Sequence, residues 1–227
     1  MKKFLLIAAV VLAVFSFGSC SKKTAKAGMT LKSGELSIGV NVAYPPFEYY
    51  DADGKTPLGF DVELIKAVAA KIGVEPKIVD VAWEGIFAGL DTDRYDCVIS
   101  AITITPERTA AYEFSKPYVG NGQSIIVKKG SAVKALKPED LAGLTVGYLT
   151  ESTSDIFMTK KAEEGLKFTV AEYDDAMNSF ADLKNGRCDV VVSDYLVAID
   201  YVSKADSPFE IVWQGNAEEF FGIAMKK

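Results

Sequence analysis

The sequence predicts an α/β protein of two lobes, each built on a mostly parallel sheet flanked by helices. Apolar, β-prone segments alternate with segments of helical periodicity, and this alternation occurs twice along the chain. A polar run with two glycines, residues 118–124, separates the two halves and is typical of a hinge. Hydrophobic residues make up 49% of the 227 residues, which is enough to give each lobe a core.

The first half begins with an expected strand at 36–40, an apolar segment bounded by glycine. An expected helix covers 61–72, because its apolar residues recur on one helical face, and Gly73 ends it. The remaining expected elements of this half are a strand at 76–81, a short helix at 84–90 and a strand at 96–100.

The second half repeats this order. Residues 125–127 begin an expected strand that crosses into the second lobe. Ser152 starts a helix, with Asp155 three residues later as its capping partner. The apolar segment 220–225 is expected to return to the first lobe. The other expected elements are strands at 145–149, 168–171 and 188–193 and a helix at 174–185.

The first 20 residues have the order of a secretory signal peptide. Lys2 and Lys3 precede an apolar run at 4–17, and small residues lead to Cys20. This cysteine resembles that of the bacterial lipobox, whose thiol carries lipid; an ordinary signal peptide with a chance cysteine is the alternative. We therefore expect a protein of the periplasm or cell surface, anchored to the membrane by lipid such as palmitate on Cys20. The expected parts are a signal peptide with lipobox at 1–20, a tether at 21–34, lobe 1 at 35–121, lobe 2 at 122–213 and a return to lobe 1 at 214–227.

The composition argues against several classes of function. The net charge of −6 disfavours a nucleic-acid partner, which requires clustered Lys and Arg. The chain has no histidine, which removes Ser-His and Cys-His catalysis and most zinc sites, so no metal and no cofactor is expected. Cys97 and Cys188 are expected to be buried thiols in different lobes, with a disulfide as the alternative in an exported protein.

Four segments, in order and at characteristic spacing, resemble one known family. They are Tyr-Pro-Pro-Phe-Glu at 44–48, Gly-Phe-Asp-Val-Glu-Leu at 59–64, the run 100–108 with Phe-Ser-Lys-Pro-Tyr at 114–118, and Asn-Gly-Arg-Cys-Asp at 185–189 with Ser-Asp at 193–194. The chain resembles the family 3 extracellular solute-binding proteins, the polar amino-acid receptors of ABC importers. The resemblance implies a two-lobed periplasmic binding protein fold of type II and an amino-acid ligand in the interlobe cleft. It also implies a membrane permease as partner, a monomer and no catalysis.

The resemblance also assigns roles to individual residues. Arg108 matches the residue that clamps the ligand carboxylate with a fork of N–H donors, and Thr103 adds a hydroxyl. Asp194 matches the carboxylate for the α-ammonium, with capping of the following helix as the alternative. Tyr44 and Trp83 match aromatic walls, with core packing as the alternative for Trp83. The complete expected site is Asn41, Tyr44, Trp83, Ser100, Ala101, Thr103, Arg108, Leu149, Ser152, Thr153 and Asp194, and Phe47 and Phe60 are assigned to core support.

Three features depart from the family pattern. Asn41 stands where receptors for basic amino acids often carry Asp, which favours a polar, uncharged ligand. Glu151 stands where a glycine is usual; it could reach the cleft and favour a cation, or be a solvated acid at a helix start. Family members usually continue beyond Lys227 into a terminal helix over lobe 1, and that helix is expected to be missing here.

Two other functions fit the same scaffold. A dehydratase of prephenate-like acids would need a general acid over the leaving hydroxyl, and Glu151 is the candidate. A ligand sensor that docks a signalling receptor is the second. The Arg108 and Asp194 clamp and the lack of a Walker-type phosphate loop favour a binding protein that delivers its ligand to an importer.

Overall fold

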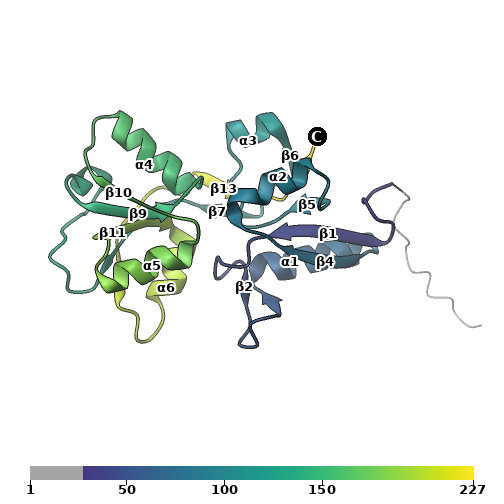
Figure 1. The fold of residues 1–227 in the computed structure, drawn as a ribbon, viewed down its shortest axis with the longest axis horizontal. Coiled ribbons are helices and arrows are strands. Elements are labelled where there is room, and N and C mark those ends of the chain that lie inside the picture. Colours follow the sequence, from purple (N-terminus) through teal and green to yellow (C-terminus); the bar gives the residue numbers. More distant parts are fainter. Residues whose placement is uncertain (1–27) are drawn as a thin grey trace, which may run out of the picture.

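The computed structural model describes residues 28–227, so the expected signal peptide and Cys20 lie outside the described residues. Two α/β lobes lie side by side and are joined by extended segments, as Figure 1 shows. This architecture confirms the predicted fold class. In the described part of the chain, no helix is long and apolar enough to cross a membrane.

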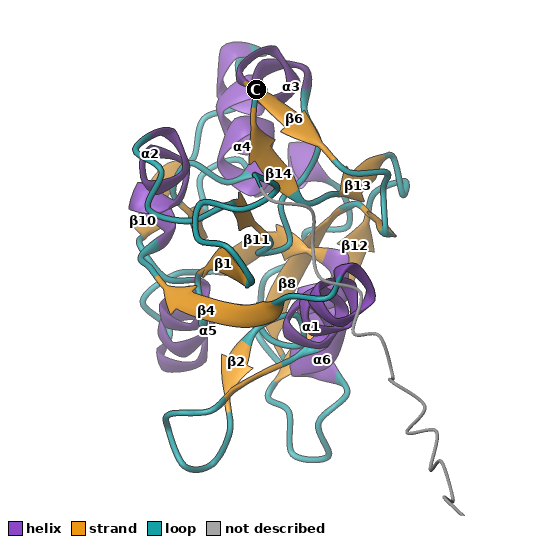
Figure 2. Ribbon diagram, turned by 90° about the vertical axis from the view of Figure 1, so that its right-hand side faces the viewer, coloured by secondary structure: helices purple, strands orange, loops and turns teal. Residues whose placement is uncertain are grey.

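The sheet of lobe 1 has the order β4-β1-β5-β14-β6. Its first three strands are parallel, and β14 is antiparallel to both of its neighbours. β14 lies near the end of the chain, so residues 224–226 complete the sheet that β1 began, and Figure 2 shows β14 beside β6. The strands are β1 (Glu35–Val40), β4 (Glu75–Asp80), β5 (Cys97–Val98), β6 (Tyr112–Phe114) and β14 (Ala224–Lys226), with a small hairpin of β2 (Tyr49–Tyr50) and β3 (Pro57–Leu58) beside them.

The sheet of lobe 2 has the order β10-β9-β11-β8-β12. Its first three strands are again parallel, and β8 is antiparallel to both β11 and β12. The strands are β8 (Gln123–Lys128), β9 (Thr145–Leu149), β10 (Thr169–Tyr173), β11 (Val190–Asp194) and β12 (Phe209–Gln214).

Helices cover both faces of each sheet, and side chains that alternate along the central strands pack against them. In lobe 1, Ile38 of β1 and Ile65 of α1 belong to one buried cluster, whereas Ile86 and Leu90 of α2 belong to another. In lobe 2, α4 packs on one face, and α5 and α6 on the other. The helices are α1 (Phe60–Ile72), α2 (Ile86–Asp91), α3 (Pro106–Ala111), α4 (Thr153–Glu163), α5 (Ala176–Asn185) and α6 (Tyr195–Val202), with 3₁₀ turns at Trp83–Gly85 and Pro138–Leu141.

The chain passes between the lobes in two adjacent segments. β7 (Val119–Asn121) and β13 (Glu219–Phe221) pair antiparallel at the lobe boundary, where Figure 2 shows β13 above β12. At Gly122 an added Cβ would lie 2.3 Å from the carbonyl oxygen of Asn216, so only glycine permits this approach. The boundary at 121/122 stays a proposal, whereas the one expected at 213/214 moves beyond Gln214, because Gln214 pairs with Ser124 in the sheet of lobe 2.

Several local expectations need correction. Phe60 is not core support: its side chain is 49% exposed, because the buried position in the first turn of α1 belongs to Asp61 instead. Phe47 is buried as expected. The helix expected at 174–185 begins at Ala176, because the Asp175 side chain accepts from the Met177 N–H and caps it.

Candidate functional site

A pocket lies between the two lobes and encloses about 330 Å³ of empty space, solvent at its mouth included. Its residues come from the segments that follow the carboxyl ends of β1, β4, β5, β9 and β11. Open α/β sheets bind ligands at this edge. The pocket is lined by all eleven residues of the expected site and one more: Asn41, Tyr44, Glu48, Trp83, Ser100, Ala101, Thr103, Arg108, Leu149, Ser152, Thr153 and Asp194.

Arg108 is held by the start of α3. The Thr105 side chain accepts from the Arg108 backbone N–H and caps the helix. The guanidinium donates from Nη1 to the Thr103 carbonyl at 3.0 Å, and it lies 5.6 Å from the centroid of the Trp83 ring and 5.4 Å from that of Phe87. Burial lowers the pKa of Arg108, but the charges of nearby carboxylates oppose that shift. The side chain is therefore a fixed, partly desolvated cation suited to a carboxylate.

Asp194 ends β11 and is buried. Its Oδ2 accepts from the Tyr44 hydroxyl at 2.7 Å, and its Oδ1 accepts from the amides of Asn121 and Gln123 at 2.8 and 3.1 Å. The side chain makes no capping bond to α6, so capping alone does not explain this aspartate. Burial, and next the charge of Glu219, raises the pKa of Asp194 to about 7.

Two aromatic residues of lobe 1 reach across to lobe 2. The Tyr44 hydroxyl donates to Asp194, and the Trp83 indole N–H donates to the Thr150 carbonyl at 3.0 Å. Both rings are nearly buried and line the pocket. Trp83 therefore contributes both to core packing and to the pocket wall. These bonds hold the lobes together in the conformation seen here.

Glu48 is the pocket residue that the sequence reasoning missed. It was recognised only as part of the segment 44–48, although a carboxylate among aromatic and proline residues was a signal for a buried role. Glu48 is fully buried, and its Oε1 accepts from the Ser100 hydroxyl at 2.9 Å. Ser100 in turn accepts from the Asn41 backbone N–H at 3.1 Å. We call Glu48, Ser100 and Ala101 the pocket floor.

The remaining expected residues occupy the pocket with some of their polar groups already engaged. The Asn41 amide donates to the Val81 carbonyl, which leaves its side-chain oxygen as the group it can offer. Ala101 has φ +47° and its N–H donates to Asp61, so this donor is taken. The Ser152 hydroxyl donates to the Leu149 carbonyl at 2.6 Å and accepts from the Asp155 N–H. The N-terminus of α4 thereby faces the pocket, where helix N–H groups favour an anion.

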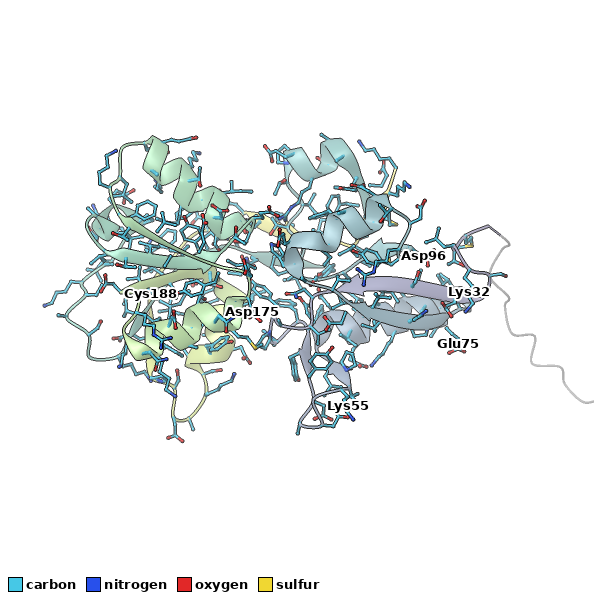
Figure 3. The ribbon with its side chains drawn as sticks, in the orientation of Figure 1. Lys32, Lys55, Glu75, Asp96, Asp175 and Cys188 are labelled. Carbon is cyan, nitrogen blue, oxygen red and sulfur yellow. The ribbon has the colours of Figure 1, made fainter. Side chains whose placement is uncertain are left out.

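Other expected residues lie away from the pocket. Glu151 has an exposed side chain and does not line the pocket; its carbonyl accepts from Arg108 at 3.4 Å. Cys97 and Cys188 are buried free thiols in separate lobes. Figure 3 shows Cys188 within lobe 2, and Lys32, Glu75 and Asp96 at the end of lobe 1 remote from lobe 2.

This geometry is matched by comparisons with known proteins. Residues 36–179 match the family described as bacterial extracellular solute-binding proteins, family 3. The chain belongs to this family. Its members are extracellular proteins, which indicates a location in the periplasm or at the cell surface.

Family 3 relatives extend the match over most of the chain. The L-cystine-binding protein TcyJ of Escherichia coli (strain K12) is 32% identical over 214 residues, which cover 88% of this chain and 79% of that protein. The arginine-bound form of truncated ArgBP from T. maritima is 39% identical with a TM-score of 0.79, and the match covers 86% of this chain and 89% of that chain. The ancestral amino acid-binding protein AncCDT-1, described as a precursor of cyclohexadienyl dehydratase, is 34% identical with a TM-score of 0.76, covering 86% and 82%.

The pocket of this family 3 fold contains one guanidinium and two carboxyl groups. A forked cation, Arg108, and an anion, Asp194, face a common space between aromatic walls. A second carboxyl group, Glu48, lies in the floor. Such a site is suited to bind a small zwitterion and orient its side chain.

Proposed function

We propose that the chain binds an amino acid whose side chain carries a positive charge, of the arginine or cystine class, and delivers it to an ABC import permease. Arg108 would receive the ligand carboxylate and Asp194 the α-ammonium, because these groups have the matching charges and lie at the edge where α/β sheets bind ligands. Ring faces of Tyr44 and Trp83 would pack against the ligand side chain.

The observation that carries the charge assignment is Glu48. An amino acid with an uncharged side chain needs one cation and one anion, and the pocket holds a further carboxyl group. A cationic side chain, or the second ammonium of cystine, would satisfy it. The relatives named for cystine and arginine support the same choice. This proposal replaces the uncharged ligand that Asn41 suggested.

A thermal-shift screen of the twenty amino acids and cystine tests this proposal. A ligand that binds only the folded state raises the melting temperature by an amount set by its concentration relative to Kd. We expect the largest shift from arginine, lysine or cystine, followed by calorimetry to measure Kd. A larger shift from glutamine or asparagine than from any cationic ligand would contradict the charge assignment.

A dehydratase function is the second candidate, since AncCDT-1 is described as a precursor of such an enzyme. Glu151 is not the general acid it would need, because its side chain is exposed and outside the pocket. Glu48 would have to act instead, and the intact pair of Arg108 and Asp194 favours binding. Turnover of prephenate or arogenate by the purified protein would overturn a binding-only function.

The membrane attachment of this receptor is a separate proposal. Cys20 would carry lipid and hold the protein as a monomer beside its permease, with 21–34 as the tether. Growth with labelled palmitate would label the wild-type protein and leave a Cys20→Ser variant unlabelled. Equal labelling of the two would contradict the anchor.

A further inference from the structure

Glu48 and Asp61 bring two carboxyl groups together beneath the pocket, and both residues are fully buried. Glu48 Oε1 accepts from the Ser100 hydroxyl, and Asp61 Oδ2 accepts from the Ala101 N–H at 2.7 Å and the Tyr118 hydroxyl at 2.8 Å. Neither Glu48 Oε2 nor Asp61 Oδ1 has a hydrogen-bond partner within residues 28–227. Buried polar atoms are rarely left without a partner, so these two oxygens require an explanation.

A single proton shared between the two groups explains both oxygens. Each carboxyl group affects the pKa of the other, so the two lie close together, and a proton held by one of them could be donated to the other. Burial, followed by the charge of Asp61, raises the pKa of Glu48 well above its usual range. Burial also raises the pKa of Asp61, but N–H and O–H donors oppose that shift. The Ala101 N–H and the Tyr118 hydroxyl both donate to Asp61, so we assign the negative charge to Asp61 and the shared proton to Glu48.

The surroundings stabilise one negative charge on the pair but do not neutralise it. The titratable groups that face it are the hydroxyls of Tyr118 and Tyr44, whose own pKa values are raised by burial and by neighbouring carboxylates. Among residues 28–227, no Lys or Arg contributes to the pKa of either carboxyl group. A ligand cation at the pocket floor would therefore supply the positive charge that these surroundings lack.

We propose that the shared proton adapts the pocket floor to a cationic ligand side chain. When a cation binds, the O–H bond of Glu48 breaks and an O–H bond forms on Asp61, so that Glu48 presents a carboxylate to the ligand. The pair keeps one proton and a net charge of −1, and no proton is exchanged with solvent at neutral pH. This inference rests on the proposed function and adds Asp61, which lies outside the pocket lining, as a positioning residue.

The affinity ratio of arginine to citrulline measures this effect. Citrulline replaces the guanidinium by a neutral urea of similar shape, so contributions of Arg108 and Asp194 to the α-groups cancel in the ratio. Calorimetry at pH 5 to 8 should show a constant ratio at the alkaline end. The ratio should fall at acid pH, where the pair takes up its second proton and becomes neutral.

Two substitutions separate the roles of the pair. Glu48→Gln can donate a hydrogen bond to Asp61 but cannot become an anion, so the ratio at pH 8 should fall at least about tenfold. Asp61→Asn donates to Glu48 and needs no proton, so the high ratio should persist and its fall should move to lower pH. Glu63→Gln, on an exposed side chain of the same helix, is the matched control and should leave the ratio unchanged.

The outcomes distinguish this inference from the proposed function. A ratio independent of pH, a ratio unchanged in Glu48→Gln, or equal losses in Glu48→Gln and Asp61→Asn would overturn the shared proton as the source of selectivity. If no ligand of the thermal-shift screen binds, the proposed function fails. The shared proton is then still decided by ¹³C NMR of the side-chain carboxyl carbons in the ligand-free protein. That spectrum should show a protonated Glu48 at pH 7 in the wild type and an ionised one in Asp61→Asn, and an ionised Glu48 in the wild type would overturn it.

Discussion

The two lobes share one sheet topology but offer opposite polarity to the pocket. In each sheet, three parallel strands are followed by an antiparallel strand and then a fifth strand. In each lobe the antiparallel strand, β14 or β8, adjoins a segment that crosses between the lobes. The backbone framework therefore does not distinguish the lobes, and their difference must come from side chains at the strand ends.

The bonds across the cleft show that difference. Three bonds at the pocket run from donors of lobe 1 to acceptors of lobe 2: Tyr44 to Asp194, Trp83 to the Thr150 carbonyl and Arg108 to the Glu151 carbonyl. The hinge has the opposite direction, because Gln123 and Thr153 of lobe 2 donate to Glu219. A zwitterionic amino acid fits the same division, with its carboxylate toward lobe 1 and its ammonium toward lobe 2. Lobe closure and ligand binding would thus depend on the same division between donors on lobe 1 and acceptors on lobe 2 at the pocket. The following predictions test this dependence.

The largest expected effect is removal of the lobe 1 cation. Arg108→Ala should weaken amino-acid binding by at least about 100-fold, because a desolvated charge pair loses one partner. Arg108→Lys should recover only part of this, since lysine retains the charge but not the fork of donors. Calorimetry gives the affinities.

Asp194→Asn provides the lobe 2 counterpart, and Arg187→Ala provides the control. Arg187 forms an exposed ion pair with Asp182, so its loss should change neither binding nor melting temperature measurably. Equal affinity of the wild type and Arg108→Ala would remove Arg108 from the site.

The next effect concerns the packing of equivalent glycines in β1 and β9, the second strand of each sheet. A Cβ on Gly39 of β1 would lie 2.6 Å from the ring of Tyr95, which is only 1% exposed and cannot move aside. A Cβ on Gly147 of β9 would lie 3.1 Å from the ring of Tyr173, which is partly exposed. Gly39→Ala should therefore lower the free energy of unfolding by about 2–3 kcal/mol, and Gly147→Ala by about 1 kcal/mol or less.

Urea unfolding followed in each lobe would measure both glycine substitutions. Combining Gly39→Ala with Tyr95→Leu should cost less than the two single substitutions added together, because removal of the ring relieves the clash. Strict additivity would show that a clash with the Tyr95 ring is not the cause of the loss. Equal costs of Gly39→Ala and Gly147→Ala would show that the two lobes tolerate an added Cβ alike.

The sequence predicted the fold because each lobe repeats a strong alternation of apolar strands with amphipathic helices. The eleven residues expected from the family resemblance all line the pocket, and six of them lie within the four motifs. The pairing of Glu48 with Asp61 could not be predicted. Burial of Asp61 in place of Phe60 depends on how α1 is rotated about its axis against the loop that carries Glu48. The hydrophobic periodicity of the sequence does not determine that rotation.

Glu219, at the hinge, is a second residue whose contacts the sequence does not predict. It lies in a short segment near the end of the chain that has no motif, yet it accepts from the Gln123 amide at 3.0 Å and from the Thr153 hydroxyl at 3.2 Å. Its charge acts on Asp194 and Arg108. Only the return of the chain to the lobe boundary brings it there.

The smallest expected effect tests this action of Glu219 on lobe 2. Asp194 must be ionised to pair with an ammonium, and its pKa is about 7. Affinity for citrulline should therefore fall roughly tenfold from pH 8 to pH 6 as Asp194 takes up a proton. Glu219→Gln removes one cause of the raised pKa, so the fall should shift to lower pH and the ratio of affinities between pH 8 and pH 6 should shrink. If Glu219→Gln leaves that ratio unchanged, the charge of Glu219 in β13 does not contribute to the raised pKa of Asp194.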